Sequence, residues 1–129
     1  MKVYLAGPIF QCEDHECMDW RLKAKQELRD FEVIDPIKRD YRGVEGENYK
    51  RIVEEDKELI ENSDILLVNQ VKLSVGTSME IFYAWQKAKR VIGISPNGQN
   101  SPWLVYHSEK ILQSLDEVVS YIQEQVVAH

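Results

Sequence analysis

The sequence predicts an α/β protein in which a parallel β-sheet carries helices on both faces. Short apolar segments alternate with longer segments of helical pattern along the chain, as in consecutive βα units. The segment 64–69, DILLVN, has an unbroken apolar centre, which is typical of a strand buried on both faces of a sheet. The chain has 129 residues, of which 43% are hydrophobic and 29% charged, so we expect one globular domain spanning residues 1–129.

The first strand is predicted over residues 2–6, KVYLA, and a Gly-Pro pair ends it. A polar helix is predicted over residues 14–30. Its apolar residues recur at helical spacing and form the stripe that we expect to face the sheet: Met18, Leu22, Ala24 and Leu28. The second strand is predicted over residues 31–35, FEVID, and Pro36 stops it.

The charged segment 37–47 contains two glycines and is predicted to be a mobile loop. The next helix is predicted over residues 48–62. Its residues expected to face inward are Ile52, Leu59 and Ile60. The third strand then covers residues 64–69, and a helix follows it to about residue 89. The fourth strand is predicted over residues 90–95, RVIGIS.

Three short elements are predicted at the C-terminal end of the chain. Residues 101–107, SPWLVYH, predict a short helix with a proline in its first turn. Residues 109–113, EKILQ, predict a short fifth strand. Ser114 and Glu117 fit a capping box that opens the last helix, which we expect to run to about residue 127.

Charge and composition exclude several classes of function. The formal net charge is −6 and the isoelectric point about 5.1, so non-specific binding to nucleic acid or to an anionic membrane is not expected. A small phosphate-bearing ligand stays compatible with this charge, because a nest of backbone N–H groups can hold an anion on an acidic protein. No apolar run approaches the ~20 residues of a membrane span. No signal peptide is recognisable, so a cytoplasmic location is expected.

The two cysteines, Cys12 and Cys17, lie close together in one polar segment. With His15 they have the spacing C-x2-H-x-C, which matches no zinc-binding pattern. A disulfide is not expected in the cytosol. We therefore expect neither a metal nor another cofactor.

The candidate site is predicted at the carboxyl edge of the sheet. In open parallel sheets, ligands bind beyond the carboxyl ends of the strands, where the strand order reverses. This rule gathers four segments around the site: residues 7–10, 35–36, 69–77 and 95–97. Tyr4 lies near the end of the first strand, where it is either a core aromatic residue or a residue that directs its hydroxyl group toward the site.

The segment 74–85, SVGTSMEIFYAW, leaves two interpretations of Glu80 open. Thr77 and Glu80 fit a capping box, with Thr77 as the N-cap and Glu80 in the first helical turn. Alternatively, Glu80 carries out chemistry, because the small polar turn of residues 74–78 directs N–H groups that can hold a phosphate or a hydroxyl. The turn lacks the Gly-Lys-Ser/Thr of a P-loop, which excludes an NTPase.

The chain resembles the nucleoside 2-deoxyribosyltransferase family, which includes 2'-deoxynucleoside 5'-monophosphate N-glycosidases and CMP hydrolases. The resemblance rests on VYLAGPIF at residues 3–10, DKELIENSDILL at 56–67 and SVGTSMEIFYA at 74–84, in this order. It implies a flavodoxin-like, Rossmann-like three-layer sandwich with a five-stranded parallel sheet. It also implies an enzyme that acts on a small deoxynucleoside or deoxynucleotide.

The resemblance implies three catalytic residues. Glu80 corresponds to the family's nucleophile, whose carboxylate attacks the anomeric carbon of the sugar and forms a glycosyl-enzyme ester. Tyr4 corresponds to the tyrosine that orients this carboxylate. Asp56 corresponds to the aspartate that hydrogen-bonds or protonates the leaving base, although a solvated charge is its ordinary interpretation on this helix. A second nucleobase or water then releases the sugar.

The resemblance and the predicted loops together give the candidate substrate-binding residues: Gly7, Pro8, Phe10, Asp35, Ser74, Gly76, Thr77 and Ser101. Family members that use free nucleosides usually carry aspartate at the position of Ser74, and the monophosphate hydrolases carry serine there. Those hydrolases often have arginine at the position of Phe10, which argues in the opposite direction. Lys38, Arg39 and Arg42 are candidates to replace that arginine.

The resemblance also implies a homo-oligomer in which a neighbouring subunit completes the site. The segment 100–107 lacks the Asn-x-Met motif that transferases often use for this purpose. Trp103 and Tyr106 are candidates for interface packing or for ligand contacts. We expect deoxyribosyl transfer between nucleobases, with hydrolysis of 5'-monophosphates as the alternative. The alternative of another class is a non-catalytic nucleotide-binding module, in which Glu80 is only a helix cap.

Overall fold

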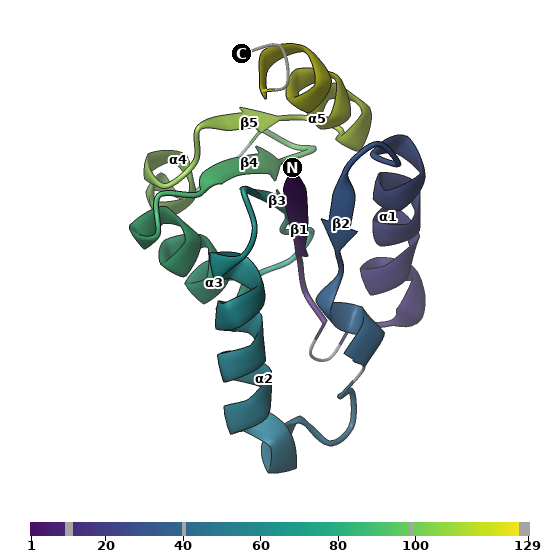
Figure 1. Cartoon of the computed structure of the whole chain (residues 1–129), viewed down its shortest axis with the longest axis vertical. Coiled ribbons are helices and arrows are strands. Elements are labelled where there is room, and N and C mark those ends of the chain that lie inside the picture. The colour runs from purple at the N-terminus through teal and green to yellow at the C-terminus, as the bar shows by residue number, and fades with distance from the viewer. Residues whose placement is uncertain (10–11, 40, 99, 127–129) are drawn as a thin grey trace.

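The computed structural model describes residues 1–9, 12–39, 41–98 and 100–126 (Figure 1). Five parallel strands form one sheet in the order β2-β1-β3-β4-β5. The strands are β1 (Lys2–Ala6), β2 (Glu32–Ile34), β3 (Ile65–Asn69), β4 (Arg90–Ile94) and β5 (Lys110–Leu112). All five lie within two residues of the ends predicted from the sequence.

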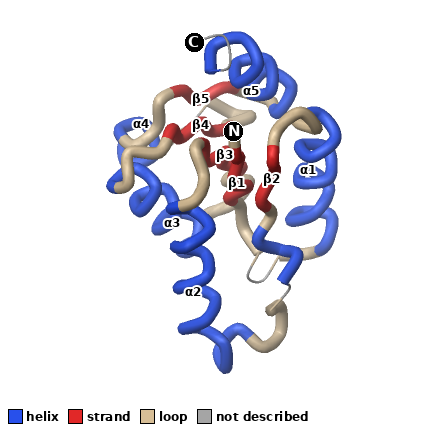
Figure 2. The backbone as a smooth tube through the Cα atoms, in the orientation of Figure 1, coloured by secondary structure: helices blue, strands red, loops and turns tan. Residues whose placement is uncertain are grey.

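The helices alternate with the strands along the chain and are α1 (Asp14–Glu27), α2 (Glu45–Glu61), α3 (Val75–Gln86), α4 (Pro102–Tyr106) and α5 (Leu115–Tyr121). A 3₁₀ turn, η1 (Pro36–Arg39), follows β2, and a π-helical turn, η2 (Ile122–Val126), extends α5. Figure 2 shows the sheet between two groups of helices. This arrangement is the predicted three-layer α/β fold. None of the described helices is long and apolar enough to span a membrane.

Each face of the sheet has its own apolar core. Side chains alternate between the two faces of a strand, so Val3 and Leu5 of β1 pack with α1 and α5. Tyr4 and Ala6 of the same strand pack with α2 and α3 on the opposite face. Tyr4 is completely buried and is therefore directed toward α3 from inside the sheet.

The strand order reverses at β1, which pairs with β2 on one side and with β3 on the other. Ala6 of β1 is in register with Val68 of β3, so the loop after β1 begins beside the end of β3. Gly7 is required there by close packing. A Cβ atom at this position would lie 2.9 Å from the carbonyl oxygen of Asn69 and 2.7 Å from the Trp20 ring.

The first helix differs from its prediction. It ends at Glu27, and Leu22, predicted to face inward, is 51% exposed. The buried face of this helix is formed by Cys17, Arg21 and Ala24, with Leu28 at the C-cap. The apolar stripe was misassigned because a charged residue, Arg21, occupies a position on the buried face.

The segment predicted as a loop before α2 is partly helical. The 3₁₀ turn occupies its beginning, and α2 starts at Glu45, three residues earlier than predicted. Asn48 has a non-helical backbone (φ −119°, ψ 15°), so the uninterrupted part of α2 begins close to the predicted start. At the other end of the chain, the Ser114 hydroxyl accepts a hydrogen bond from the Glu117 N–H at 3.1 Å, which confirms the predicted cap of α5.

Candidate active site

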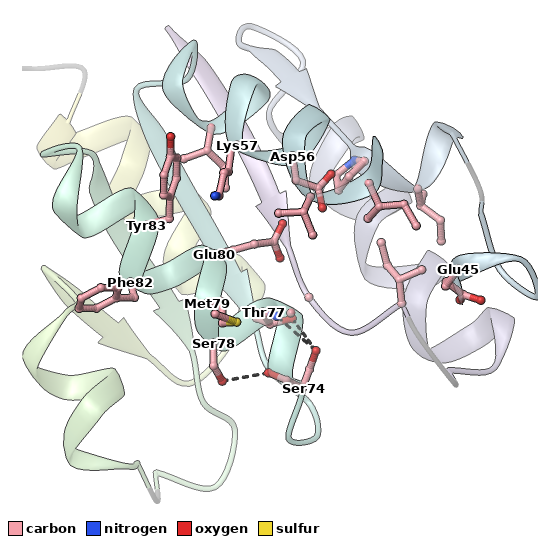
Figure 3. A pocket seen from close by; sticks show the side chains of 18 of the residues that line it. Glu45, Asp56, Lys57, Ser74, Thr77, Ser78, Met79, Glu80, Phe82 and Tyr83 are labelled. Atoms are coloured by element: carbon pink, nitrogen blue, oxygen red, sulfur yellow. Dashed lines mark hydrogen bonds between the residues drawn. The ribbon is translucent and has the colours of Figure 1, made fainter. Parts of the chain in front are cut away.

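A cavity of about 670 Å³ lies at the carboxyl edge of the sheet, between η1, α2 and α3 (Figure 3). Its wall combines the loop after β1, η1 and the loop that follows it, one face of α2, and residues of α3 from its first turn to Gln86. Charged and polar lining residues include Arg39, Arg42, Glu45, Asp56, Lys57, Ser74, Thr77, Ser78, Glu80 and Tyr83. The position agrees with the rule that ligands bind where the strand order of a parallel sheet reverses.

The helix α3 begins at the cavity, and Ser74 is its N-cap. Ser74 has an extended backbone (φ −142°, ψ 123°), and its Oγ accepts hydrogen bonds from the N–H and the hydroxyl of Thr77 at 3.3 and 3.1 Å. The hydroxyl of Ser78 donates to the Ser74 carbonyl at 2.9 Å. The predicted capping box of Thr77 and Glu80 is therefore wrong, because the helix begins almost one turn earlier. Glu80 lies in the second turn and has no capping role.

The carboxylate of Glu80 is bonded instead to Tyr4. The Tyr4 hydroxyl donates a hydrogen bond to Oε2 of Glu80. Ile81 and Ala84 hold α3 against the sheet on the face of Tyr4, and this packing brings the two side chains together. Glu80 is only half-buried, so one side of its carboxyl group faces the cavity. The structure thus joins two of the three predicted catalytic residues directly.

Burial is the main influence on the charge of Glu80. It raises the pKa of Glu80 to about 8, and the negative charge of Asp56 acts in the same direction. The hydrogen bond from Tyr4 and the positive charges of Arg21 and Arg39 oppose this shift. The pKa of Tyr4 is raised as well, first by burial and then by the charge of Glu80. Tyr4 therefore remains a neutral hydrogen-bond donor.

Asp56 lies on α2 and points into the same space as Glu80 (Figure 3). Burial raises the pKa of Asp56, and the adjacent guanidinium of Arg39 lowers it in part. Nη2 of Arg39 donates a hydrogen bond to Oδ1 of Asp56. Two carboxyl groups in one cavity can divide the roles of proton donor and nucleophile when their environments hold one of them protonated.

Asp35, predicted to bind substrate, is not among the residues that line this cavity. Its carboxylate is buried and accepts hydrogen bonds from Nη1 of Arg21 at 2.8 Å and from the Ile37 N–H at 3.2 Å. The carboxylate also lies 2.7 Å from the Lys25 ammonium. Arg21 also donates to the carbonyls of Leu5 and Gly7, both at 3.0 Å. Arg21 and Asp35 therefore fix the ends of β1 and β2 beneath the cavity.

The remaining predicted binding residues divide into two groups. Gly7 and Gly76 line the cavity with Ser74 and Thr77, whereas Pro8 is buried outside its lining. Ser101 caps α4 by accepting from the Trp103 N–H at 3.1 Å and does not line the cavity.

Phe10 and the side chain of Lys38 lie outside the part of the chain that the structure describes. Within that part, no group of three or more His, Cys, Asp or Glu side chains is arranged to hold a metal.

The sequence did not predict the structural contacts that two arginines make at or beneath this cavity. Arg21 is 1% exposed, and its guanidinium lies 4.9 Å from the centre of the Trp20 ring. The sequence pattern that could have indicated its burial is its position at helical spacing between Cys17 and Ala24, which are both buried. Arg39 was considered only as a phosphate ligand. Its ion pair with Asp56 joins residues 17 positions apart, and no local pattern indicates it.

The profile of the family described as nucleoside 2-deoxyribosyltransferase matches residues 3–116. The chain belongs to the nucleoside 2-deoxyribosyltransferase family. This membership confirms the resemblance inferred from the sequence and indicates an enzyme of glycosyl-transferring or glycosidase type. No match was found among the curated proteins.

Three solved structures share the fold of this family member. A 2-deoxyribosyltransferase from Bacillus psychrosaccharolyticus has a TM-score of 0.78 and 24% identity, over 94% of this chain and 92% of that chain. A conserved protein from Enterococcus faecalis V583 has a TM-score of 0.76 and 16% identity, over 96% and 98%. The CMP N-glycosidase BcmB from Clostridium botulinum has a TM-score of 0.61 and 17% identity, over 95% and 99%.

Proposed function

We propose that this protein cleaves the N-glycosidic bond of a 2'-deoxynucleoside through a covalent intermediate on Glu80 and transfers the deoxyribosyl group to another nucleobase. The observation that carries the proposal is the Tyr4–Glu80 hydrogen bond at the cavity wall. It orients a carboxyl group that the helix does not use as a cap. A module that only binds nucleotides would need no such oriented carboxyl group opposite a second one.

In the first step, an oxygen of the Glu80 carboxylate forms a bond to the anomeric carbon, and the bond from that carbon to the base nitrogen breaks. The electron pair of the broken bond stays on the base, which takes a proton from Asp56. In the second step, a nitrogen of the incoming base attacks the anomeric carbon and loses its proton to Asp56. The ester bond breaks, and its electron pair restores the Glu80 carboxylate.

The surroundings of the two carboxyl groups act on this division of roles in both directions. Tyr4 donates to the ionised form of Glu80, and the charges of Arg21 and Arg39 also favour that form. Burial of Asp56 raises its pKa and favours the protonated form that a departing base requires. Because burial also raises the pKa of Glu80 to about 8, the ionised form of Glu80 becomes more populated as the pH rises toward that value, whereas the protonated form of Asp56 becomes less populated, so the reaction should have a pH optimum.

Hydrolysis of a deoxynucleoside 5'-monophosphate is the second candidate reaction. The N-terminus of α3 lies on the cavity, and backbone N–H groups at a helix N-terminus favour a phosphate. The Ser74 hydroxyl accepts two hydrogen bonds from Thr77, which leaves its own proton to donate to a ligand. In this reaction, water replaces the second base, and the sugar phosphate and the free base are the products.

We also propose that a second copy of the chain covers the outer face of α3 and α4. Large apolar side chains are exposed there next to the cavity: Met79, Phe82, Trp85, Trp103 and Tyr106, at 41–73%. Trp103 and Phe82 belong to the lining of the cavity itself. A partner on this face would therefore close the open side of the site.

The direct test is incubation with dCMP, dGMP and the free deoxynucleosides, with and without an acceptor base, followed by chromatography of the products. Transfer predicts a new deoxynucleoside only when the acceptor is present. Hydrolysis predicts release of many equivalents of free base per active site without an acceptor. Glu80→Gln and Glu80→Ala should abolish nearly all cleavage while the protein stays folded. Near-normal turnover in either variant would contradict the role of Glu80 as nucleophile.

A further inference from the structure

Arg39 occupies an unusual place in the wall of the cavity. It lies at the end of η1, and its guanidinium reaches across to two consecutive acidic residues of α2. Nη1 donates to Oε2 of Glu55 at 2.5 Å, and Nη2 donates to Oδ1 of Asp56. Consecutive side chains on a helix point about 100° apart, so the carboxylates of Glu55 and Asp56 diverge. The planar guanidinium of Arg39 contacts both because each of its two terminal nitrogens binds one carboxylate.

Several contacts fix Arg39 in this position. Its side chain is 23% exposed, and its guanidinium lies 5.8 Å from the centre of the Tyr41 ring. The 3₁₀ turn that carries it is held in turn by the bond from the Ile37 N–H to the buried Asp35. Arg39 is therefore part of a connected path from Arg21 and Asp35 beneath the cavity to Asp56 in its wall.

We propose that Arg39 is a positioning residue that fixes the Asp56 carboxyl group toward the cavity and controls when that group carries a proton. Glu55 binds Nη1 of Arg39 and so fixes the orientation of the guanidinium, which contacts Asp56 through Nη2. This geometry argues against Arg39 as a free phosphate ligand, because its positive charge is already shared between two carboxylates. The kinetic part of the inference rests on the proposed function, and the titration part does not.

Three charged groups act on Asp56, namely Arg39 from η1, Glu55 from α2 and Arg21 from α1, and the charge of Asp56 acts in turn on Glu80 from α3 and Tyr4 from β1. The other titratable or charged groups that line the cavity are Tyr41, Arg42, Glu45, Lys57 and Tyr83. Burial raises the pKa of Asp56, and Arg39 is the largest influence in the opposite direction. Loss of Arg39 should therefore raise the pKa of Asp56.

The titration experiment compares Arg39→Met with Arg51→Met in protein labelled with ¹³C at the aspartate carboxyl carbons. Arg51 is a matched control, because it lies 4.0 Å from Glu55, is 66% exposed and is absent from the cavity lining. The Asp56 signal is assigned with Asp56→Asn. We expect the titration midpoint of Asp56 to rise by about one pH unit in Arg39→Met and to stay unchanged in Arg51→Met. An unchanged midpoint in Arg39→Met would overturn the proposal.

The kinetic experiment measures kcat, KM and the pH profile with the substrate that the parent protein uses. In Arg39→Met we expect kcat to fall at least about tenfold with little change in KM, and the profile to shift to higher pH. Arg39→Lys keeps the charge but cannot hold both carboxylates, so kcat should fall with a smaller pH shift. A large rise in KM for the monophosphate alone, without a pH shift, would identify Arg39 as a phosphate ligand and contradict the proposal.

Failure of the proposed function is distinguishable from failure of this inference. If Glu80→Gln keeps its turnover, the proposed reaction is wrong, but the titration of Asp56 still reports the influence of Arg39. If Glu80→Gln is inactive and the Asp56 midpoint is the same with and without Arg39, the reaction stands and the positioning role is wrong.

Discussion

Replacing Glu80 by Gln should stabilise the protein at alkaline pH. In the unfolded chain, Glu80 ionises near pH 4.5, and in the folded protein its pKa is about 8. Between these values the unfolded state releases a proton that the folded state keeps, so the free energy of unfolding falls as the pH rises. This decrease in the free energy of unfolding is absent below about pH 4.5 and complete above about pH 8. Glutamine cannot ionise, so the free energy of unfolding of the variant does not decrease for this reason.

The size of the effect follows from the pKa shift. One pKa unit corresponds to about 1.4 kcal/mol, so the full shift from 4.5 to about 8 sets an upper limit of about 5 kcal/mol. Because Glu80 is only half-buried and its charged form can approach water, we expect about 2 kcal/mol. Urea unfolding at pH 5.5, 7 and 9 measures the difference between parent and variant, which should grow in favour of Glu80→Gln as the pH rises.

A matched control separates this effect from ordinary surface electrostatics. Glu58→Gln changes an exposed residue of α2, and its pH dependence should follow that of the parent. A gap between Glu80→Gln and the parent that is equal at pH 5.5 and pH 9 would refute the reasoning. A variant that is less stable by about 1 kcal/mol at every pH would instead indicate a capping role.

Three further substitutions test the site. Tyr4→Phe removes the donor to Glu80 and should lower kcat by about tenfold to a hundredfold with a smaller change in KM, as steady-state kinetics will show. Asp56→Asn should slow cleavage more than it weakens binding of a substrate analogue, measured by calorimetry; equal rates would return Asp56 to an ordinary surface role. Ser74→Asp places a negative charge at the start of α3 and should lower kcat/KM for a monophosphate more than for the matching free deoxynucleoside. An unchanged ratio would show that Ser74 does not face a phosphate.

The sheet and most of its helices were predictable because apolar patterning determines them locally. β3 is apolar at its first four positions and buried at all five, and β1 alternates between two cores. The rule for strand ends located the candidate site at the carboxyl edge of this sheet, and the resemblance assigned Tyr4, Asp56 and Glu80 to it. The structure brings Tyr4 and Glu80 into contact and places Asp56 in the same cavity.

The predictions that differ from the structure have two physical causes, which are competition between local patterns and contact between distant residues. Ser74-x-x-Thr77 and Thr77-x-x-Glu80 both fit the start of a helix, and only the extended backbone at Ser74 decides between them. Asp35 follows a strand end, as a ligand-binding residue would. A buried arginine 14 residues earlier takes its carboxylate, and no short pattern in the sequence encodes that pairing.

The most direct test of the proposed mechanism is detection of the deoxyribosyl ester on Glu80. The protein is mixed with a deoxynucleoside or its monophosphate without an acceptor base, quenched in acid within the first turnover, and digested for peptide mass spectrometry. The proposed mechanism predicts release of one base per active site and a peptide that carries one added deoxyribosyl group, or its 5'-phosphate, on Glu80. Base release in the first turnover with an unmodified Glu80, or with the sugar attached to another residue, would contradict it.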